Sequence, residues 1–236
     1  MARESVLLDD RFDHAFFISA DALAHRLLAR MTAETQSLKD LGFKTVTGTI
    51  VWNRLKSSMR DVAAEDTLPL VWGNGIRPFR FLRLGNRANK ATHVVLNQRT
   101  RGIVIRGGAI LVKRMTAKEE ARRLVACRVP PALEKAADGW FAENHVNIVK
   151  PVDPAIELDA VLGLLNSSLY DYVFRSLNGN TQVSATELAM LPIKQGPELQ
   201  AIAAQARKLT KADGEDALAS QMPIASGIIV SRLAIA

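Results

Sequence analysis

The sequence is poor in cysteine, with Cys127 as its one thiol among 236 residues. A single thiol excludes a disulfide framework and a zinc site built on thiolates. Apolar runs are short as well, because none reaches the roughly 18 residues that a membrane-spanning helix needs. The first ten residues carry three acidic side chains and lack the layout of a secretory signal. These absences predict a cytoplasmic protein that does not enter a membrane.

Motifs for chemistry are also scarce. The chain has no Gly-x-Gly-x-x-Gly loop and no Walker phosphate loop, and its four histidines show no metal-binding spacing. The acidic residues within 153–159 lack a lysine at nuclease spacing, and Cys127 is expected in the core of a helix. Glu143 and His145 could form an acid–base pair, but no third partner can be named. The residues alone therefore favour a binding module over an enzyme.

Positive charge is concentrated in one block. The formal net charge is +7, with 48% hydrophobic and 23% charged residues, which is typical of one large or two small globular domains. Residues 74–123 hold only two acids against 13 basic residues: Arg77, Arg80, Arg83, Arg87, Lys90, Arg99, Arg101, Arg106, Lys113, Arg114, Lys118, Arg122 and Arg123. Such a block on one surface would attract a polyanion. The alternative is a solvated face that only keeps the protein in solution.

Sequence patterns predict a mixed α+β fold. We expect a strand at 13–19 and a helix over 20–41 with Gly42 as its C-cap. Short β-rich runs follow at 46–52, 69–72, 79–84, 92–96, 102–112 and 145–149. Helices are expected from the capping box at 116–119, from 153 through Tyr172, from the capping box at 184–187, and over 196–212. The prediction is a β-rich mixed sheet with flanking helices at both ends.

Four segments together resemble a known family. They are TGTIVWNRLK at 47–56, LVKRMTAKEEARRL at 111–124, ENHVNI at 143–148, and a stretch from LLNS at 164 through FR at 174 to VSATEL at 183 and LPI at 191. In this order they resemble the C-terminal target-recognition region of TaqI-like N6-adenine DNA methyltransferases of restriction–modification systems. The resemblance covers roughly residues 40–195.

The resemblance implies a division of labour. In that family an N-terminal domain binds S-adenosylmethionine and carries an Asn/Asp-Pro-Pro-Tyr/Phe motif, and the C-terminal part recognises DNA. Neither feature occurs here, since the one Pro-Pro pair, at 130–131, follows Val129. The resemblance thus implies a recognition half, inactive alone and without a cofactor, whose partners are double-stranded DNA and a catalytic methyltransferase domain or subunit. Residues 1–42 would be a lead-in or a remnant of the catalytic domain, 43–195 the recognition domain, and 196–236 a C-terminal helix and tail.

Candidate DNA contacts follow from residue chemistry. Arginine can bind guanine through two hydrogen bonds, and asparagine or glutamine can do the same with adenine. Lysine, arginine and helix N-termini suit phosphates. We predict DNA contacts at Asn53, Arg54, Lys56, Asn74, Arg77, Arg80, Lys113, Arg114, Thr116, Asn144, Arg175, Asn178 and Gln182. For Trp52 the sequence leaves open a core position and a position on the DNA-contacting surface. For Asn144, His145 and Asn147 it leaves open a strand face near DNA and a buried hydrogen-bonded network.

Two other functions stay open at this stage. One is a fragment of a type I restriction–modification specificity subunit, which also ends with a Ser-capped short helix and a Leu-Pro-Ile-like exit. Those chains continue into a long heptad helix, whereas the apolar pattern after Pro197 is short. The other is a self-contained nuclease-like enzyme, for which the sequence offers no carboxylate–lysine cluster.

Overall fold

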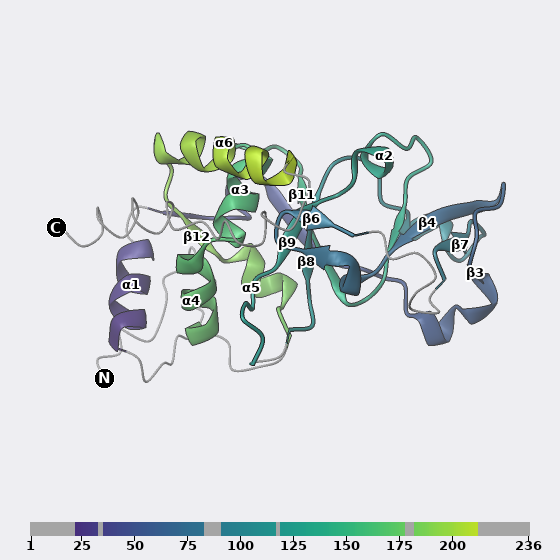
Figure 1. Cartoon of the computed structure of the whole chain (residues 1–236), viewed down its shortest axis with the longest axis horizontal. Coiled ribbons are helices and arrows are strands. Elements are labelled where there is room, and N and C mark those ends of the chain that lie inside the picture. The colour runs from purple at the N-terminus through teal and green to yellow at the C-terminus, as the bar shows by residue number, and fades with distance from the viewer. Residues whose placement is uncertain (1–21, 33–34, 83–90, 117–118, 178–181, 212–236) are drawn as a thin grey trace.

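The computed structural model describes residues 22–32, 35–82, 91–116, 119–177 and 182–211. The described part is elongated (Figure 1). Helices gather at one end, an antiparallel sheet crosses the middle, and short strands form the other end. The expected mixture of α and β is confirmed. No helix among these residues has the length and apolar character to cross a membrane.

The central sheet has the strand order β2 (Phe43–Thr47), β11 (Val146–Pro151), β8 (Ile110–Lys113), β9 (Ala126–Arg128), all antiparallel. β8 and β11 have buried residues on both faces, where alternate residues point to opposite sides, whereas the edge strand β2 is partly exposed. Ile110 and Val112 join the core at the helical end, whereas Leu111 and Ile148 join a second core. The sheet therefore lies between two packed layers.

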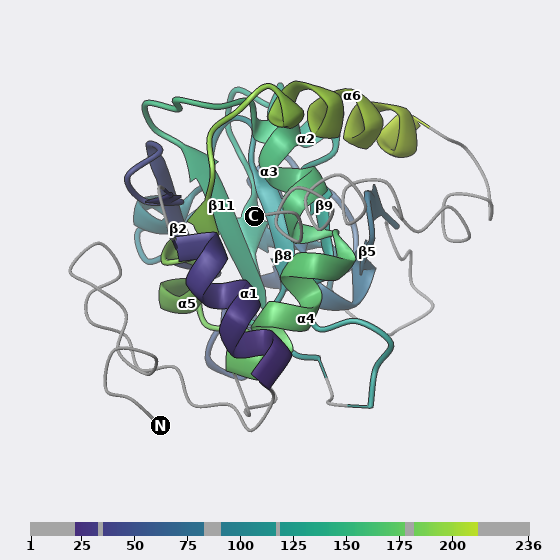
Figure 2. The same cartoon turned by 90° about the vertical axis from the view of Figure 1, so that its left-hand side faces the viewer.

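The helical layer covers one face of this sheet. It contains α1 (Ala22–Thr32), α3 (Leu158–Leu165), α4 (Ser168–Leu177), α5 (Ala185–Ala189) and α6 (Glu198–Lys211). In Figure 2, α1 and α4 lie in front of β11 and β8. The short strands β1 (Gln36–Ser37) and β12 (Pro192–Ile193) pair antiparallel within it. Leu38, Ile110, Leu162 and Ile202 share one core. Residues from the expected segments 1–42, 43–195 and 196–236 therefore pack together.

The far end is a smaller sheet with the order β10 (Phe141–Ala142), β4 (Thr67–Val71), β7 (His93–Val95), β3 (Met59–Arg60). β10 runs parallel to β4, and the other pairs are antiparallel. Ile50, Leu70, Val94 and Phe141 form its core. A hairpin of β5 (Ile76–Arg77) and β6 (Arg80–Phe81) follows β4 in the chain and packs beside β9, and the short helix α2 (Pro131–Glu134) connects β9 to β10.

Several predicted elements are correct in place. The capping box at Ser184 and Glu187 starts α5, with both reciprocal hydrogen bonds present. β7, β11 and α6 lie where strands and a helix were expected. The predicted strands at 69–72 and 79–84 correspond to β4 and β6, shifted or shortened by a few residues. The strand expected at 13–19 lies outside the described residues.

Other predictions are wrong, and the predicted helix after Thr116 is the clearest. Residues 119–125 form turns and bends that lead into β9. The backbone N–H groups of Arg123 and Leu124 donate to Oδ1 of Asp171 at 2.7 and 2.8 Å, and Nε of Arg123 donates to the Thr116 hydroxyl at 3.1 Å. A contact with α4, 48 positions away, therefore takes the N–H groups that a local helix would have used.

Helix boundaries also differ from the patterns. The first helix ends at Thr32 instead of 41, and Gly42, at φ +80°, belongs to a turn before β2. The helix expected to start at 153 begins at Leu158 and breaks at Asn166, whose side chain bonds to both the N–H and the C=O of Ala126. Strand structure expected over 46–52 and 102–112 is limited to β2 and β8, with 3₁₀ turns at Trp52–Arg54, Lys56–Ser58 and Arg101–Ile103.

Candidate nucleic-acid interface

The turn at residues 143–145 joins the two sheets, since β10 precedes it and β11 follows it. Its backbone is held by the smaller sheet, because the N–H of Glu143 donates to Val71 at 3.0 Å and that of Asn144 donates to Ile50 at 3.0 Å. A Cβ at Gly73 would lie 2.7 Å from the His145 carbonyl oxygen. Glycine at that position thus permits the 3₁₀ turn Gly73–Gly75 to pack directly on this junction.

Arg114 brings three of the predicted DNA contacts together. It directly follows β8, and its backbone N–H donates to the His145 carbonyl at 2.9 Å. Its Nη1 donates to the Asn144 carbonyl at 2.8 Å, and its Nη2 donates to Oε1 of Gln182 at 2.9 Å. Arg114, Asn144 and Gln182 therefore form one polar group, which we call the junction cluster.

Glu143 and His145 add a second feature to this junction. Oε1 of Glu143 lies 2.6 Å from Nδ1 of His145, and the two side chains are 1% and 47% exposed. Oε2 accepts a hydrogen bond from the His145 backbone N–H at 3.0 Å. The acid–base neighbourhood suspected from the sequence is thus a real contact, although no third catalytic partner joins it within the described residues. The sequence signal for this contact was the spacing of Glu143 and His145, two positions apart.

Asn147 differs from its neighbours in this segment. It is fully buried, accepts from the Thr47 hydroxyl at 2.9 Å and donates to the Val183 carbonyl at 2.6 Å. Asn144 is half-buried and His145 is exposed. The buried network therefore holds for Asn147, whereas the turn before it faces outward and its contact with DNA stays a prediction.

The hairpin of β5 and β6 positions Asn74, Arg77 and Arg80. Arg77 and Arg80 are paired across the hairpin, and all three side chains are half-buried. Nη1 of Arg77 donates to the carbonyls of Asn74 and Ile76, both at 2.9 Å. These bonds hold the guanidinium against its own turn, so any base contact would use its remaining donors.

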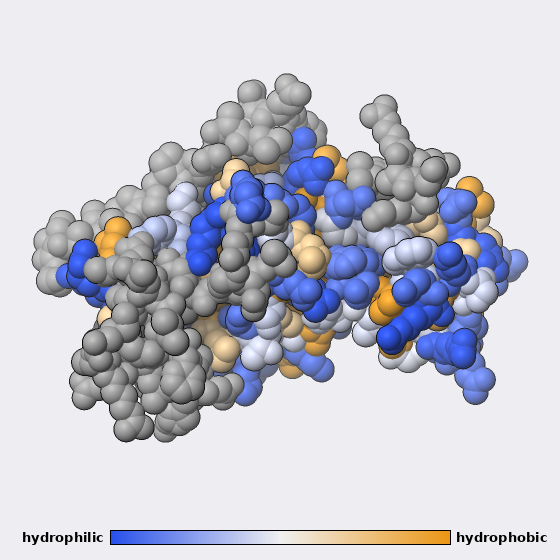
Figure 3. All heavy atoms as spheres, turned by 90° about the horizontal axis from the view of Figure 1, so that it is seen from below, coloured by the Kyte–Doolittle hydropathy of each residue, from blue (hydrophilic) through white to orange (hydrophobic). Residues whose placement is uncertain are grey.

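A third group lies on consecutive 3₁₀ turns before β3. Asn53, Arg54 and Lys56 are exposed, as is Trp52 with 45% of its surface accessible. The Lys56 ammonium lies 5.1 Å from the centre of the Trp52 ring, within the range of a cation–π contact. Trp52 is therefore a surface residue here. Seen from below (Figure 3), the end of the molecule that carries the small sheet is largely hydrophilic, with separate hydrophobic patches.

Part of the basic block is internal, contrary to its expected placement on one surface. Arg123 is 2% exposed, and Nη2 of Arg122 donates to the carbonyls of Asn166 and Ser167. Burial lowers the pKa of both guanidinium groups below the ordinary arginine value. These two arginines join the segment before β9 to the start of α4, so their charge serves the fold.

Lys113, Thr116 and Arg175 also have internal partners. Nζ of Lys113 lies 2.8 Å from Glu120, and Nε of Arg175 lies 2.9 Å from Asp171. The Thr116 side chain is buried against Arg123. These three side chains have partners within the protein, whereas Arg54 and Lys56 are exposed. Their role as DNA contacts stays a prediction, and Asn178 lies outside the described residues.

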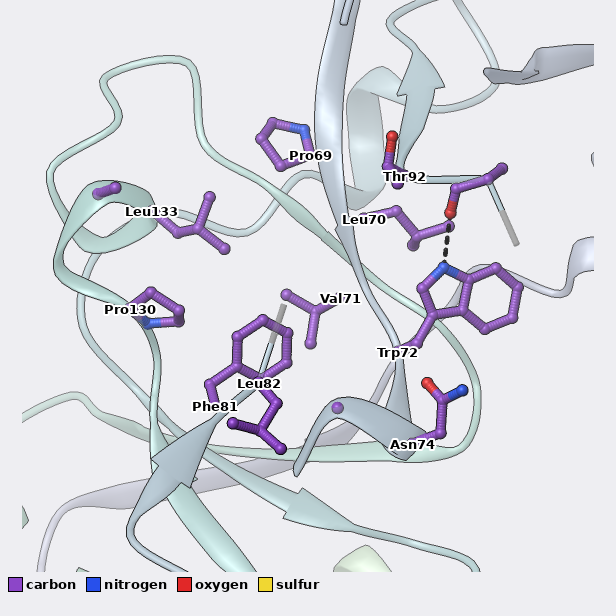
Figure 4. Close-up of a pocket in the computed structure, with 13 residues that line it drawn as sticks. Pro69, Leu70, Val71, Trp72, Asn74, Phe81, Leu82, Thr92, Pro130 and Leu133 are labelled. Carbon is purple, nitrogen blue, oxygen red and sulfur yellow. Dashed lines mark hydrogen bonds between the residues drawn. The ribbon is translucent and has the colours of Figure 1, made fainter. Parts of the chain in front are cut away.

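An apolar pocket of about 230 Å³ lies beside Asn74 (Figure 4). Its walls come from β4, β6 and the start of α2, and include Val71, Phe81 and Leu133. The Trp72 indole N–H at its rim donates to the Ala91 carbonyl at 2.7 Å. The lining lacks acidic and basic side chains, so the pocket offers shape and apolar surface only.

Redox, thiol and metal chemistry find no support in the described residues. Cys127 is buried in β9, and burial raises the pKa of its thiol far above the usual value, so the nucleophilic thiolate is not available. Its expected core position is confirmed, though on a strand and not on a helix. No group of three His, Cys, Asp or Glu side chains in the described ranges could hold a metal ion.

The chain is similar to two curated proteins, and no family model matches it. Type II methyltransferase M.PstI from Providencia stuartii is 31% identical over 173 residues, which cover 72% of this chain and 34% of that protein. Type II methyltransferase M.BsuBI from Bacillus subtilis is 32% identical over 157 residues, covering 64% of this chain and 31% of that protein.

Among solved structures, a chain from a study of assembly and conformational transition in a type I R-M system overlaps 86% of this chain and 43% of its own length. Its TM-score is 0.43 and its sequence identity 12%, too low to carry an argument. The chain spans about a third of the length of the curated relatives that it matches. Its relatives are thus type II methyltransferases, each matched over one part of its length.

Proposed function

We propose that this chain is the sequence-specific DNA-recognition part of an N6-adenine methyltransferase of a restriction–modification system, of the TaqI-like kind. The similarity to parts of two type II methyltransferases supports a methyltransferase context. The junction cluster is the observation that carries the recognition role. It gathers a guanidinium, a backbone amide turn and a side-chain amide from distant parts of the chain, at a junction bordered by the exposed His145.

In this proposal the candidate contacts divide by chemistry. Asn74, Arg77 and Gln182 have the amide and guanidinium groups that recognise base edges. Arg54 and Lys56 are exposed cations that suit phosphates, which fix the position of the protein on the duplex. The catalytic half, with S-adenosylmethionine, would come from another region or subunit and act on an adenine turned out of the helix.

The test is a titration of the 236-residue chain with a short DNA duplex over a series of salt concentrations. The proposal expects binding that weakens steeply with salt, because the logarithm of the binding constant falls by about 0.9 per phosphate neutralised for each logarithmic unit of salt. Selection from a random-sequence duplex library should then yield one preferred site. No binding at low salt, or binding without a salt dependence, contradicts the proposal.

A further inference from the structure

A buried carboxylate lies directly behind a half-exposed histidine at the junction of the two sheets. Glu143 is 1% exposed, and its Oε1 lies 2.6 Å from Nδ1 of His145. Burying a carboxylate costs several kcal/mol unless it is paired. We propose that His145 is a phosphate-contacting residue of the DNA interface, and that Glu143 is the positioning residue that orients its ring. This inference rests on the proposed function.

The geometry determines which nitrogen can meet a ligand. Nδ1 is the ring nitrogen that faces Oε1 of Glu143, at an ion-pair distance of 2.6 Å, and this buried oxygen makes no hydrogen bond to any described residue. Nε2 is then the ring nitrogen left for a ligand, on a side chain that is 47% exposed. The backbone of His145 is held on both sides, since its N–H donates to Oε2 of Glu143 at 3.0 Å and its carbonyl accepts from Arg114 at 2.9 Å. The imidazole is therefore presented from a fixed position.

The surroundings favour an anion as the ligand. Arg114, the cation bound to this turn, donates to the Asn144 carbonyl next to His145. A phosphate oxygen only accepts, so contact with Nε2 requires a proton on that nitrogen. The imidazolium would lie between Glu143 and the phosphate, and any proton that the free ring lacks would come from solvent as DNA binds. The contact would be the same for all sequences, because phosphates carry no base information.

Two substitutions of His145 test the role of Nε2 separately from any effect on folding. His145→Asn keeps an N–H near the position of Nδ1, facing Glu143, and removes the Nε2 edge. His145→Gln places a neutral amide near the position of Nε2. Glu143→Gln keeps an acceptor for the His145 backbone N–H and removes the charge. Lys208→Ala, on the exposed side of α6, is the control for loss of one distant positive charge.

The experiment uses the whole chain and a short duplex of random sequence. Binding is measured over a salt series, and proton uptake by calorimetry in two buffers of different ionisation enthalpy. We expect His145→Asn to weaken binding several-fold, to lower the salt slope by about 0.9 and to abolish proton uptake. His145→Gln should recover part of the affinity without proton uptake. Glu143→Gln should reduce uptake and affinity, and Lys208→Ala should leave uptake unchanged.

Each other outcome contradicts the inference in a recognisable way. If His145→Asn is folded by its thermal unfolding and binds with wild-type affinity, slope and proton uptake, His145 does not touch DNA. If affinity falls but the wild-type protein takes up no proton, the ring gains no proton on binding and the coupled protonation is wrong; an unchanged salt slope in His145→Asn would show that the contact is not with a phosphate. If the wild-type chain does not bind DNA, the proposed function itself fails. Should His145→Asn not fold, His145→Gln answers the same question through proton uptake.

Discussion

Arg114 and Gln182 are 68 positions apart in the chain, and the arginine Nη2 donates to the glutamine Oε1 at 2.9 Å. The backbone reinforces this contact, because the N–H of Val183 donates to the Arg114 carbonyl at 2.8 Å. The segment before α5 is thereby attached to the end of β8. Arg114 and Gln182, both predicted DNA contacts from separate parts of the sequence, thus lie together beside the 143–145 turn.

Replacing Gly73 should disturb this junction from the other side. In Gly73→Ala the new Cβ would lie 2.7 Å from the His145 carbonyl, which Arg114 already holds by a hydrogen bond. We expect the free energy of unfolding to fall by about 1–3 kcal/mol, as for other overpacked sites, and DNA affinity to fall with it. Urea unfolding and duplex titration measure both.

Gly102→Ala is the matched control, because nothing lies within 4 Å of a Cβ there. It should change unfolding and DNA binding little. Equal behaviour of the two alanine variants would mean that the Gly73 turn does not need to approach the junction closely.

Removing Asp171 should be the most destabilising of these changes. Its carboxylate accepts from the backbone of Arg123 and Leu124 and pairs with Arg175. Asp171→Ala leaves the buried backbone N–H groups of Arg123 and Leu124 without their acceptor, and an unsatisfied buried polar group costs about 1–3 kcal/mol. Chemical denaturation should show this loss.

The comparison is Glu157→Ala, which breaks an exposed pair with Arg207. Surface pairs contribute about 0–1 kcal/mol, so this variant should unfold nearly like the wild type. A loss of similar size in both variants would contradict the structural role assigned to Asp171.

Base-reading and phosphate-binding residues should separate by substitution. Asn74→Ala or Arg77→Ala should cost about 1–3 kcal/mol on the preferred site and little on random DNA, the size of one bidentate base contact. Lys56→Ala should weaken binding to both duplexes alike, because it would contact phosphate. Titration of each variant against both duplexes distinguishes the two behaviours.

An equal loss on the two duplexes for Arg77→Ala would make that side chain another phosphate contact. Unchanged affinity in the folded Lys56, Asn74 and Arg77 variants would mean that these three side chains lie on a solvated surface that does not contact DNA.

The chain alone should neither bind S-adenosylmethionine nor methylate DNA. The reason is the missing methyl-donor loop and the missing Asn/Asp-Pro-Pro-Tyr/Phe motif in its sequence. Calorimetry with the methyl donor should give no stoichiometric heat, and a tritium-transfer assay should give no labelled duplex. Clear binding of the donor would show that the recognition-half assignment is wrong.

Local signals in the sequence were sufficient for part of the fold. The capping box at Ser184 needs only neighbours three positions apart, and α6 follows from an apolar stripe with a 3.6-residue period. Short runs of β-forming residues likewise located β7 and β11. Composition, charge and missing motifs also directed attention to binding rather than catalysis. These properties depend on residues close together in the chain.

Tertiary structure decided what distant residues do to one another. Asp171 takes the N–H groups of Arg123 and Leu124, so the pattern after Thr116 does not become a helix. Arg123 enters the interior, where its Nε donates to Thr116 and its backbone N–H donates to Asp171, whereas Trp52 stays outside with Lys56 over its ring. Glu143 and His145 were visible as neighbours, but their place between two sheets depends on β10 pairing with β4, some 70 positions away, and on β11 pairing with β8. Such pairings gain their free energy only when the whole core forms, which is why no local pattern specifies them.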